Sequence, residues 1–203
     1  MLKVSLRNVG VAARVVVGGG LVVFPTDTVY GLGCDPFNVD AVRRLLRLKG
    51  GREKALPVLA GCLGDVERVA VVSGGARRVA ERFWPGALTL VLPKRGVLPA
   101  VVTSGLDSVG VRVPNHDVAL KLARLCGGLL VGTSANKSRI KPVASAAEAF
   151  EQLGDDVDIV LDDGVFVLGV SSTVIDLTGE ESKVLRVGSV NPEEVLKIFE
   201  ESI

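Results

Sequence analysis

The sequence predicts an α/β protein with a mixed sheet, and three observations support this fold class. Short apolar runs rich in valine alternate along the chain with segments of helical periodicity. Apolar residues make up 48% and charged residues 23% of the 203 residues, which are the proportions of a folded protein. No internal repeat interrupts the alternation. At this length one domain is expected, so we assign residues 1–203 to a single domain.

Helix starts are marked by side chains that can accept hydrogen bonds from free backbone N–H groups. Asn8, Asn38 and Asn115 each precede a segment of helical periodicity, and Ser145 with Glu148 forms an S-x-x-E capping pattern. An Asn-Pro pair precedes the last such segment, where proline suits the first helical position. The predicted helices are 8–17, 39–48, 65–71, 75–83, 116–126, 146–153 and a final helix from Pro192 to about 201.

Strands are predicted where short aliphatic runs lie between glycine or proline residues. The run LVVF at 21–24 follows three glycines and ends at Pro25. Residues 26–37 are predicted to form a loop, and residues 49–54 a second, basic loop. The predicted strands are 21–24, 55–60, 88–92, 109–113, 128–132, 158–162 and 172–177.

Composition excludes several classes of protein. The net charge of +1 argues against a protein that coats nucleic acid by bulk electrostatics. Three widely spaced cysteines and one histidine are too few ligands for a zinc site of the usual kind, so we expect no tightly bound metal. No signal peptide and no membrane-length apolar run is present, and the odd cysteine count suits a reducing, cytoplasmic setting.

Two polar loops in the first half are candidate ligand sites, because ligands of α/β sheets bind at strand ends. The segment 25–33, PTDTVYGLG, offers hydroxyls and two glycines, although its composition alone favours an ordinary turn. The segment 48–54, LKGGREK, places three cations around two glycines. Such a loop suits a polyphosphate, but it is also typical of a solvated helix end.

Two further polar loops lie in the second half. The segment 132–138, GTSANKS, follows a predicted strand and is either an anion site or a turn rich in caps. The segment 170–173, VSST, precedes a strand, and Arg186 either folds back to it or ends a hairpin with its side chain exposed. Arg112 lies within an apolar strand pattern, so it needs a partner, which is either a ligand carboxylate or an acidic side chain.

Taken in order, these loops resemble the YrdC-like family of threonylcarbamoyl-AMP synthases. One segment alone would be weak evidence, whereas seven in the family's order are specific. Together they cover most of the chain from about 20 to 190. The seven segments are PTDTVYGLG at 25–33, LKGGREKALPVL at 48–59, WPGALTLVL at 84–92, SGLDSVGVRVP at 104–114, GTSAN at 132–136, SSTVIDLT at 171–178 and VLRVGSV at 184–190.

The resemblance implies a twisted mixed sheet flanked by helices around a large concave cavity. It implies formation of threonylcarbamoyl-AMP and pyrophosphate from L-threonine, bicarbonate and ATP, with Mg²⁺ accompanying the nucleotide. The product would serve N6-threonylcarbamoyladenosine formation in tRNA, through a second enzyme assembly that transfers it. By the same resemblance, the threonine-binding positions are Thr28, Arg112, Gly132 and Ser172, and the nucleotide-binding positions are Lys49, Arg52, Lys54, Ser108, Ser134, Asn136, Pro142 and Arg186, with Lys49 and Arg52 catalytic.

The sequence departs from the family pattern in the basic loop. The family spaces its lysine and arginine as K-x-R, whereas Arg52 here stands three residues after Lys49. We still expect both side chains to face the ATP phosphates, because Gly50 and Gly51 can adopt positive φ and turn the loop sharply. In the alternative, Lys54 does part of this work. Leu59 is a second departure, because relatives often have histidine or lysine there.

Two other functions remain open at this point. One is carbamoyl-adenylate chemistry on a different substrate, as in the related domain of hydrogenase-maturation proteins. The other is an RNA-binding module, or a weak tRNA contact, which rests on a cluster of cations. That cluster consists of Arg43, Arg44, Arg47, Lys49, Arg52 and Lys54.

Overall fold

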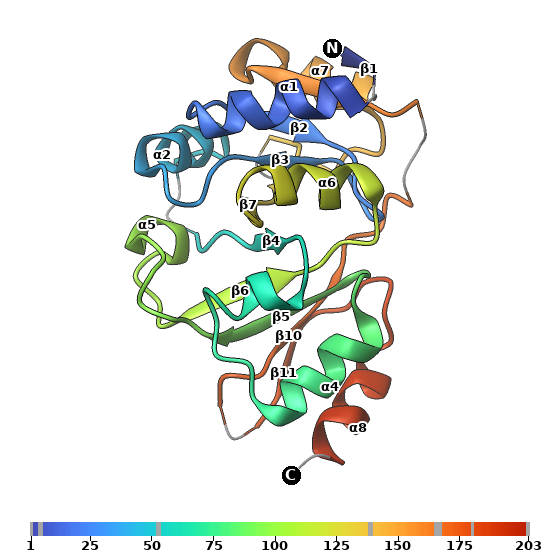
Figure 1. Cartoon of the computed structure of the whole chain (residues 1–203). Coiled ribbons are helices and arrows are strands. Elements are labelled where there is room, and N and C mark those ends of the chain that lie inside the picture. The colour runs from blue at the N-terminus through green and yellow to red at the C-terminus, as the bar shows by residue number, and fades with distance from the viewer. Residues whose placement is uncertain are drawn as a thin grey trace.

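The strands form two mixed sheets, one in the upper and one in the lower part of Figure 1, with helices packed around them. The predicted α/β class with mixed strands is therefore confirmed, and its strands are divided between two sheets. The N-terminus and the C-terminus lie at opposite ends of the molecule (Figure 1). This computed structural model describes residues 2–3, 6–51, 54–137, 140–164, 168–179 and 181–201.

The five-stranded sheet has the order β1-β9-β2-β3-β8. β9 is parallel to both β1 and β2, and β3 is antiparallel to β2 and β8. The prediction of a loop over 26–37 is wrong for β3, whose two glycines carry little strand propensity. A Cβ atom on Gly31 would stand 2.9 Å from the ring of Phe24, so the glycine lets the two strands pair around that ring. The bounds are β1 Leu2–Lys3, β2 Val22–Phe24, β3 Gly31–Gly33, β8 Thr133–Ser134 and β9 Ile159–Asp162.

The six-stranded sheet has the order β11-β10-β5-β6-β4-β7. β10 is parallel to β5 and β4 is parallel to β6, while the other neighbours are antiparallel. The edge strand β11 was not among the predicted strands, although the hairpin alternative for Arg186 implies it, and all four of its residues are exposed. The bounds are β4 Val58–Ala60, β5 Leu88–Pro93, β6 Ser108–Arg112, β7 Leu129–Val131, β10 Thr173–Asp176 and β11 Lys183–Arg186.

The helices begin where capping side chains satisfy their first N–H groups. Asn38 accepts from Ala41 N at 3.0 Å, and Asn191 accepts from Glu193 N at 3.0 Å, as predicted. Four described helices pack in pairs, α1 with α6 and α4 with α8 (Figure 1). The bounds are α1 Leu6–Val17, α2 Val39–Leu48, α3 Leu63–Val66, α4 Gly74–Phe83, α5 Ala100–Thr103, α6 Asp117–Leu125, α7 Ala146–Leu153 and α8 Pro192–Glu200.

Two predicted caps and one capping box need correction, and so does the helix predicted at 65–71, because α3 covers only Leu63–Val66. Asn8 lies inside α1, which begins two residues earlier. α6 begins after His116 rather than after Asn115, so Asn115 is not its cap. Ser145 does cap α7, but Glu148 accepts from Ala144 N at 3.0 Å, one residue before the N–H that a full capping box would satisfy.

Apolar side chains of both sheets and of helices that pack on them, such as α2 and α4, form the core. The largest fully buried side chains include Phe24, Tyr30 and Leu90, all completely shielded from solvent. Within the described ranges, no helix is both long enough and apolar enough to cross a membrane.

Candidate functional site

A cavity of about 540 Å³ has the six-stranded sheet as its floor. Strand register aligns a row of residues across this floor. Leu59 pairs with Arg112, and Val174 pairs with Thr89 and with Arg186. The antiparallel register of β5 and β6 brings Thr89 beside Arg112, so these pairs form one continuous row. The row places a guanidinium, a hydroxyl and a second guanidinium on one surface of the cavity.

The opposite wall of the cavity comes from the five-stranded sheet. Thr26 and Thr28 follow β2, and Ser134 lies in β8. Thr26 Oγ1 donates to Val29 O at 2.6 Å and accepts from Thr28 N at 3.2 Å. The interpretation as an ordinary turn is therefore correct for Thr26. Thr28 is different, because its hydroxyl also faces the other sheet.

Arg112 is buried, with 5% of its surface exposed, and it lies between the two sheets. Its Nε donates to Gly86 O at 2.8 Å, its Nη1 donates to Thr28 Oγ1 at 3.0 Å, and its Nη2 pairs with Asp27. Burial lowers the pKa of this guanidinium, while Asp27 acts in the opposite direction. These bonds use three of five N–H donors, which leaves one on each terminal nitrogen for a carboxylate. Arg112 therefore has an acidic side chain as its partner and also lines the cavity, while its binding of a ligand carboxylate stays a prediction.

Ser172 joins the floor of the cavity to the end of β11. Its hydroxyl lies 2.8 Å from Thr89 Oγ1, and Arg186 Nη2 donates to it at 3.0 Å. Arg186 Nε also donates to Ser172 O at 2.9 Å, and burial lowers the pKa of Arg186. The hairpin and the folded-back arginine predicted as alternatives thus occur together. Because one N–H of Arg186 holds the Ser172 hydroxyl in place, both polar groups keep a fixed orientation at the cavity.

Lys49 is not among the described residues that line this cavity, and its predicted role at the phosphates stays a prediction. Its ammonium donates to Ser134 O at 2.9 Å, to Asn136 O at 2.6 Å and to Asn136 Oδ1 at 3.1 Å. Burial lowers the pKa of Lys49 to about 8. Lys49 therefore braces the loop that presents Ser134, because carbonyl oxygens of this loop take up its donors.

The basic loop after Lys49 turns as predicted. Gly50 and Gly51 have φ values of 87° and 67°, in the region that glycine enters without steric cost. Lys54, at the end of the loop, lines the cavity. Arg52 lies outside the described residues, so its predicted role stays a prediction.

The structure brings most of the predicted site residues to one cavity. Asn136 is buried beside Lys49, and neither it nor Pro142 is among the described residues that line the cavity. Sequence reasoning missed Thr89 and Asp176, although each is a polar residue in an aliphatic strand, which was an available signal. The predicted residues that line the cavity are Thr28, Lys54, Ser108, Arg112, Gly132, Ser134, Ser172 and Arg186.

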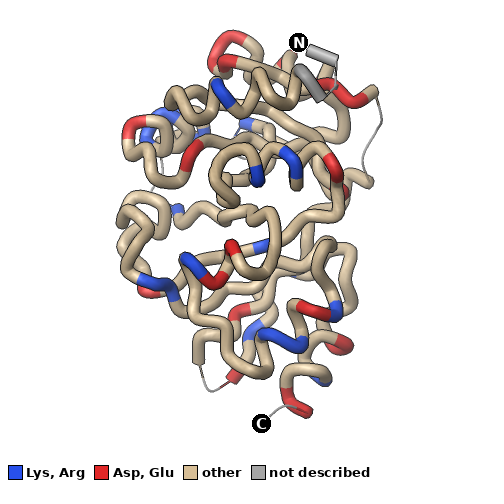
Figure 2. Tube along the Cα trace, viewed as in Figure 1, with Lys and Arg blue, Asp and Glu red and all other residues tan. Residues whose placement is uncertain are grey.

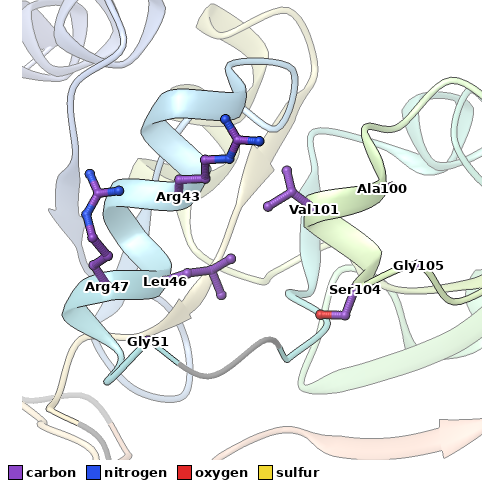
Figure 3. Close-up of a pocket in the computed structure, with 8 residues that line it drawn as sticks. All are labelled: Arg43, Leu46, Arg47, Gly51, Ala100, Val101, Ser104 and Gly105. Atoms are coloured by element: carbon purple, nitrogen blue, oxygen red, sulfur yellow. The ribbon is translucent and has the colours of Figure 1, made fainter.

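A second hollow, of about 480 Å³, lies between α2 and α5. Figure 3 shows Leu46 and Val101 facing each other across it, while the guanidinium groups of Arg43 and Arg47 diverge. Arg44, from the same cation cluster, pairs with Asp158 at 2.7 Å. Figure 2 shows acidic residues interspersed among the basic ones along the trace. Among the described members of the cluster, Arg43 and Arg47 therefore line the hollow, Arg44 is paired with Asp158, and Lys49 contacts the loop of Ser134.

Comparison with known proteins gives consistent matches. The family model Sua5/YciO/YrdC, described as "Telomere recombination", matches residues 14–188. A Pyrococcus abyssi protein named threonylcarbamoyl-AMP synthase is 40% identical over an alignment of 203 positions, which covers 98% of this chain and 59% of that protein. A Thiobacillus denitrificans protein of the same name is 39% identical over 170 residues, 83% of this chain and 89% of that protein. The structure of P. abyssi Sua5 complexed with L-threonine superposes with a TM-score of 0.92 at 38% identity, over 97% of this chain and 59% of that one.

Proposed function

We propose that this chain, which belongs to the Sua5/YciO/YrdC family, is a threonylcarbamoyl-AMP synthase. It would form threonylcarbamoyl-AMP and pyrophosphate from L-threonine, bicarbonate and ATP. The observation that carries the proposal is the cavity itself. Arg112 presents two N–H donors beside small hydroxyls there, and Lys54 and Arg186 add cations in the same cavity.

The threonine would bind at the row of floor residues around Arg112. A guanidinium with one N–H on each terminal nitrogen suits the two oxygens of a carboxylate. The hydroxyls of Thr28 and Ser172 lie on opposite sides of the cavity and could hold the polar groups of the amino acid. Gly132 has no side chain, and Leu59 fills the space that one would take, with its Cγ 2.5 Å from an ideal Cβ position.

The nucleotide would extend from the threonine toward the cationic parts of the cavity. Lys54 and Arg186 are suited to the phosphates, because charge-assisted hydrogen bonds to phosphate oxygens are strong. Ser134 and Ser108 add hydroxyl donors. Mg²⁺ would arrive bound to the phosphates as part of the substrate, where it supplies neutralisation of the charge on the leaving pyrophosphate.

The reaction then needs positioning rather than a nucleophile from the enzyme. The threonine amine forms a bond to the carbon of CO₂ and loses a proton, which gives a carbamate. With bicarbonate as the carbon source, a C–O bond of bicarbonate also breaks, and its oxygen leaves as water together with that proton. A carbamate oxygen next attacks the α-phosphorus, and the bond to the β-phosphate oxygen breaks, which releases pyrophosphate. The residues described here would hold the two reactants in line and limit the access of water to the labile carbamate.

The same proposal covers the reaction class, the fate of the product, the cellular setting and contact with tRNA. The reaction is that of a nucleotidyltransferase, and the product would pass to a tRNA threonylcarbamoyl-transferase assembly. The setting that suits this role is cytoplasmic. A weak direct contact with tRNA is the remaining use for the exposed cations of α2.

Pyrophosphate release in the presence of Mg²⁺ tests the proposal. We expect release only when ATP, L-threonine and bicarbonate are all present, with threonylcarbamoyl-AMP detected by mass spectrometry. Equal release without threonine or without bicarbonate would contradict it. Release that is supported by carbamoyl phosphate instead would favour carbamoyl-adenylate chemistry on another substrate, and salt-sensitive RNA binding without release would favour an RNA-binding module.

A further inference from the structure

Asp176 is the one carboxylate among the described residues that line the cavity. It lies on β10 and pairs with Val91 of β5, which in turn pairs with Gly110 of β6. Both hydrogen bonds that the structure describes at Asp176 use Oδ1. This atom accepts from Thr178 N at 2.9 Å and from Thr178 Oγ1 at 2.6 Å. The turn after β10 therefore fixes the orientation of the carboxylate.

The floor beside Asp176 is flat because Gly110 has no side chain. A Cβ atom on Gly110 would have Thr89 Cγ2 at 3.6 Å and Pro57 Cβ at 3.7 Å, so no neighbour forbids it. Because Gly110 carries no Cβ atom, the backbone between Pro57 and Val91 stays uncovered. Both of these residues also line the cavity. An aliphatic strip that ends in a carboxylate matches a ligand part with an apolar face and hydroxyl groups at its edge.

Asp176 and the guanidinium of Arg112 lie toward different ends of the floor. Two strand spacings across the sheet and two residues along β10 separate their Cα atoms by about 12 Å. The Arg112 guanidinium donates to Gly86 O, before the start of β5, whereas Asp176 pairs with Val91 within β5. If Arg112 binds the threonine carboxylate, Asp176 therefore lies at the nucleotide end of the cavity.

A carboxylate next to a nucleotide repels the phosphates, but it is a good acceptor for sugar hydroxyls, as in dinucleotide-binding sites. We propose that Asp176 accepts hydrogen bonds from the ribose hydroxyls of the bound nucleotide, and that it makes this site selective for ribonucleotides. This inference rests on the proposed function, and it names a specificity residue for it.

Calorimetric titration of the whole chain with ATP, 2′-deoxy-ATP and 3′-deoxy-ATP tests the proposal. We expect at least one deoxy nucleotide to bind the wild-type chain about tenfold more weakly than ATP, equivalent to about 1.4 kcal/mol. In Asp176→Ala this ratio should fall below twofold. Thr178→Ser is the matched control, since it changes the turn residue but keeps the carboxylate and both groups that donate to it. It should retain the wild-type ratio.

The remaining outcomes would overturn the proposal in distinguishable ways. Equal binding of all three nucleotides by the wild-type chain would refute ribose recognition while leaving the proposed function intact. A loss in Asp176→Ala that is the same for all three nucleotides would assign Asp176 to the turn alone. The same uniform loss seen only with Mg²⁺ present would assign it to the metal. Absence of ATP binding by the wild-type chain would refute the proposed function itself.

Discussion

The guanidinium of Arg112 on β6 donates to the hydroxyl of Thr28 at 3.0 Å, and this bond joins the two sheets across the cavity. Thr28 follows β2 of one sheet, and Asp27 beside it pairs with the same guanidinium. The three side chains therefore form one buried unit, in which removal of any member affects the other two. This unit motivates the first prediction.

Arg112→Ala should weaken threonine binding by more than a hundredfold, while ATP binding changes less than threefold. Removing one partner of a buried ion pair costs about 3–5 kcal/mol, so the single variant also leaves Asp27 uncompensated. The variant Asp27→Asn/Arg112→Ala removes both charges and is the control for stability. Calorimetry on both variants separates the effects. Unchanged threonine affinity in a folded variant would show that Arg112 serves only the ion pair.

Gly132→Ala should destabilise the fold by about 1–3 kcal/mol, because the new Cβ would lie 2.5 Å from Leu59 Cγ. Leu59→Ala alone should also destabilise it, by leaving a cavity. The double variant Leu59→Ala/Gly132→Ala should be more stable than the sum of the two changes predicts. Urea unfolding of the four proteins measures this coupling, and strict additivity would mean that the two residues do not compete for space.

Lys49 should make stability depend on pH in a defined window. Its pKa is about 8 in the folded chain, below the ordinary lysine value of 10.5, so the folded chain binds fewer protons than the unfolded chain between these two values. The contribution of Lys49 to the free energy of unfolding must therefore rise as the pH increases through that window. Relative to Lys49→Met, the wild-type chain should gain unfolding free energy between pH 7.5 and about pH 10. A difference between the two proteins that does not vary with pH would contradict the lowered pKa.

Gly51→Val should lower both stability and turnover through the backbone alone. Gly51 has a φ of 67°, and a Cβ atom there would have no neighbour within 4 Å. The penalty therefore comes from the left-handed conformation, which costs an ordinary residue about 1–2 kcal/mol. Asparagine tolerates this conformation, so Gly51→Asn is the matched control and should be milder. Equal losses in the two variants, by thermal unfolding and pyrophosphate release, would rule out this cause.

Lys54→Ala should raise the KM for ATP, because Lys54 lines the cavity. The sequence also predicts that Lys49→Ala and Arg52→Ala each lower turnover more than tenfold, about 1.4 kcal/mol of transition-state stabilisation. Steady-state kinetics of the three variants separates these roles. Full activity in Arg52→Ala together with loss in Lys54→Ala would assign the usual arginine role to Lys54.

The sequence predicts those parts of the fold that depend on local physics. Asn38 and Asn191 were predicted as caps because capping needs only a side chain and the next turn of backbone. β3 and β11 could not be predicted in this way. Gly31 pairs in a strand because Phe24 lies against it, and β11 exists because β10 offers it a partner. Both depend on neighbours that periodicity does not record.

Most residues that line the cavity could be predicted from the sequence, but the contacts of their neighbours could not. The loops that carry Thr28, Gly132 and Ser172 do meet at one cavity, as the resemblance implied. The direction of Lys49 was not predictable, because it depends on where the carbonyl oxygens of Ser134 and Asn136 come to lie after folding. From the sequence alone, a lysine beside two glycines suits a phosphate and a group of carbonyl oxygens equally well.

The cavity has its floor on one sheet and its wall on the other, so a bound substrate acts as a non-covalent cross-link between them. A ligand that binds only the folded state stabilises it by about 2.7 kcal/mol at a hundred times its Kd. Because Thr28 and Ser134 contribute to the wall, this gain reaches backbone amides that touch no ligand. Hydrogen exchange at β3 and β8 should therefore slow when substrate is present, and the short five-stranded sheet gains rigidity from the molecule that it helps to enclose.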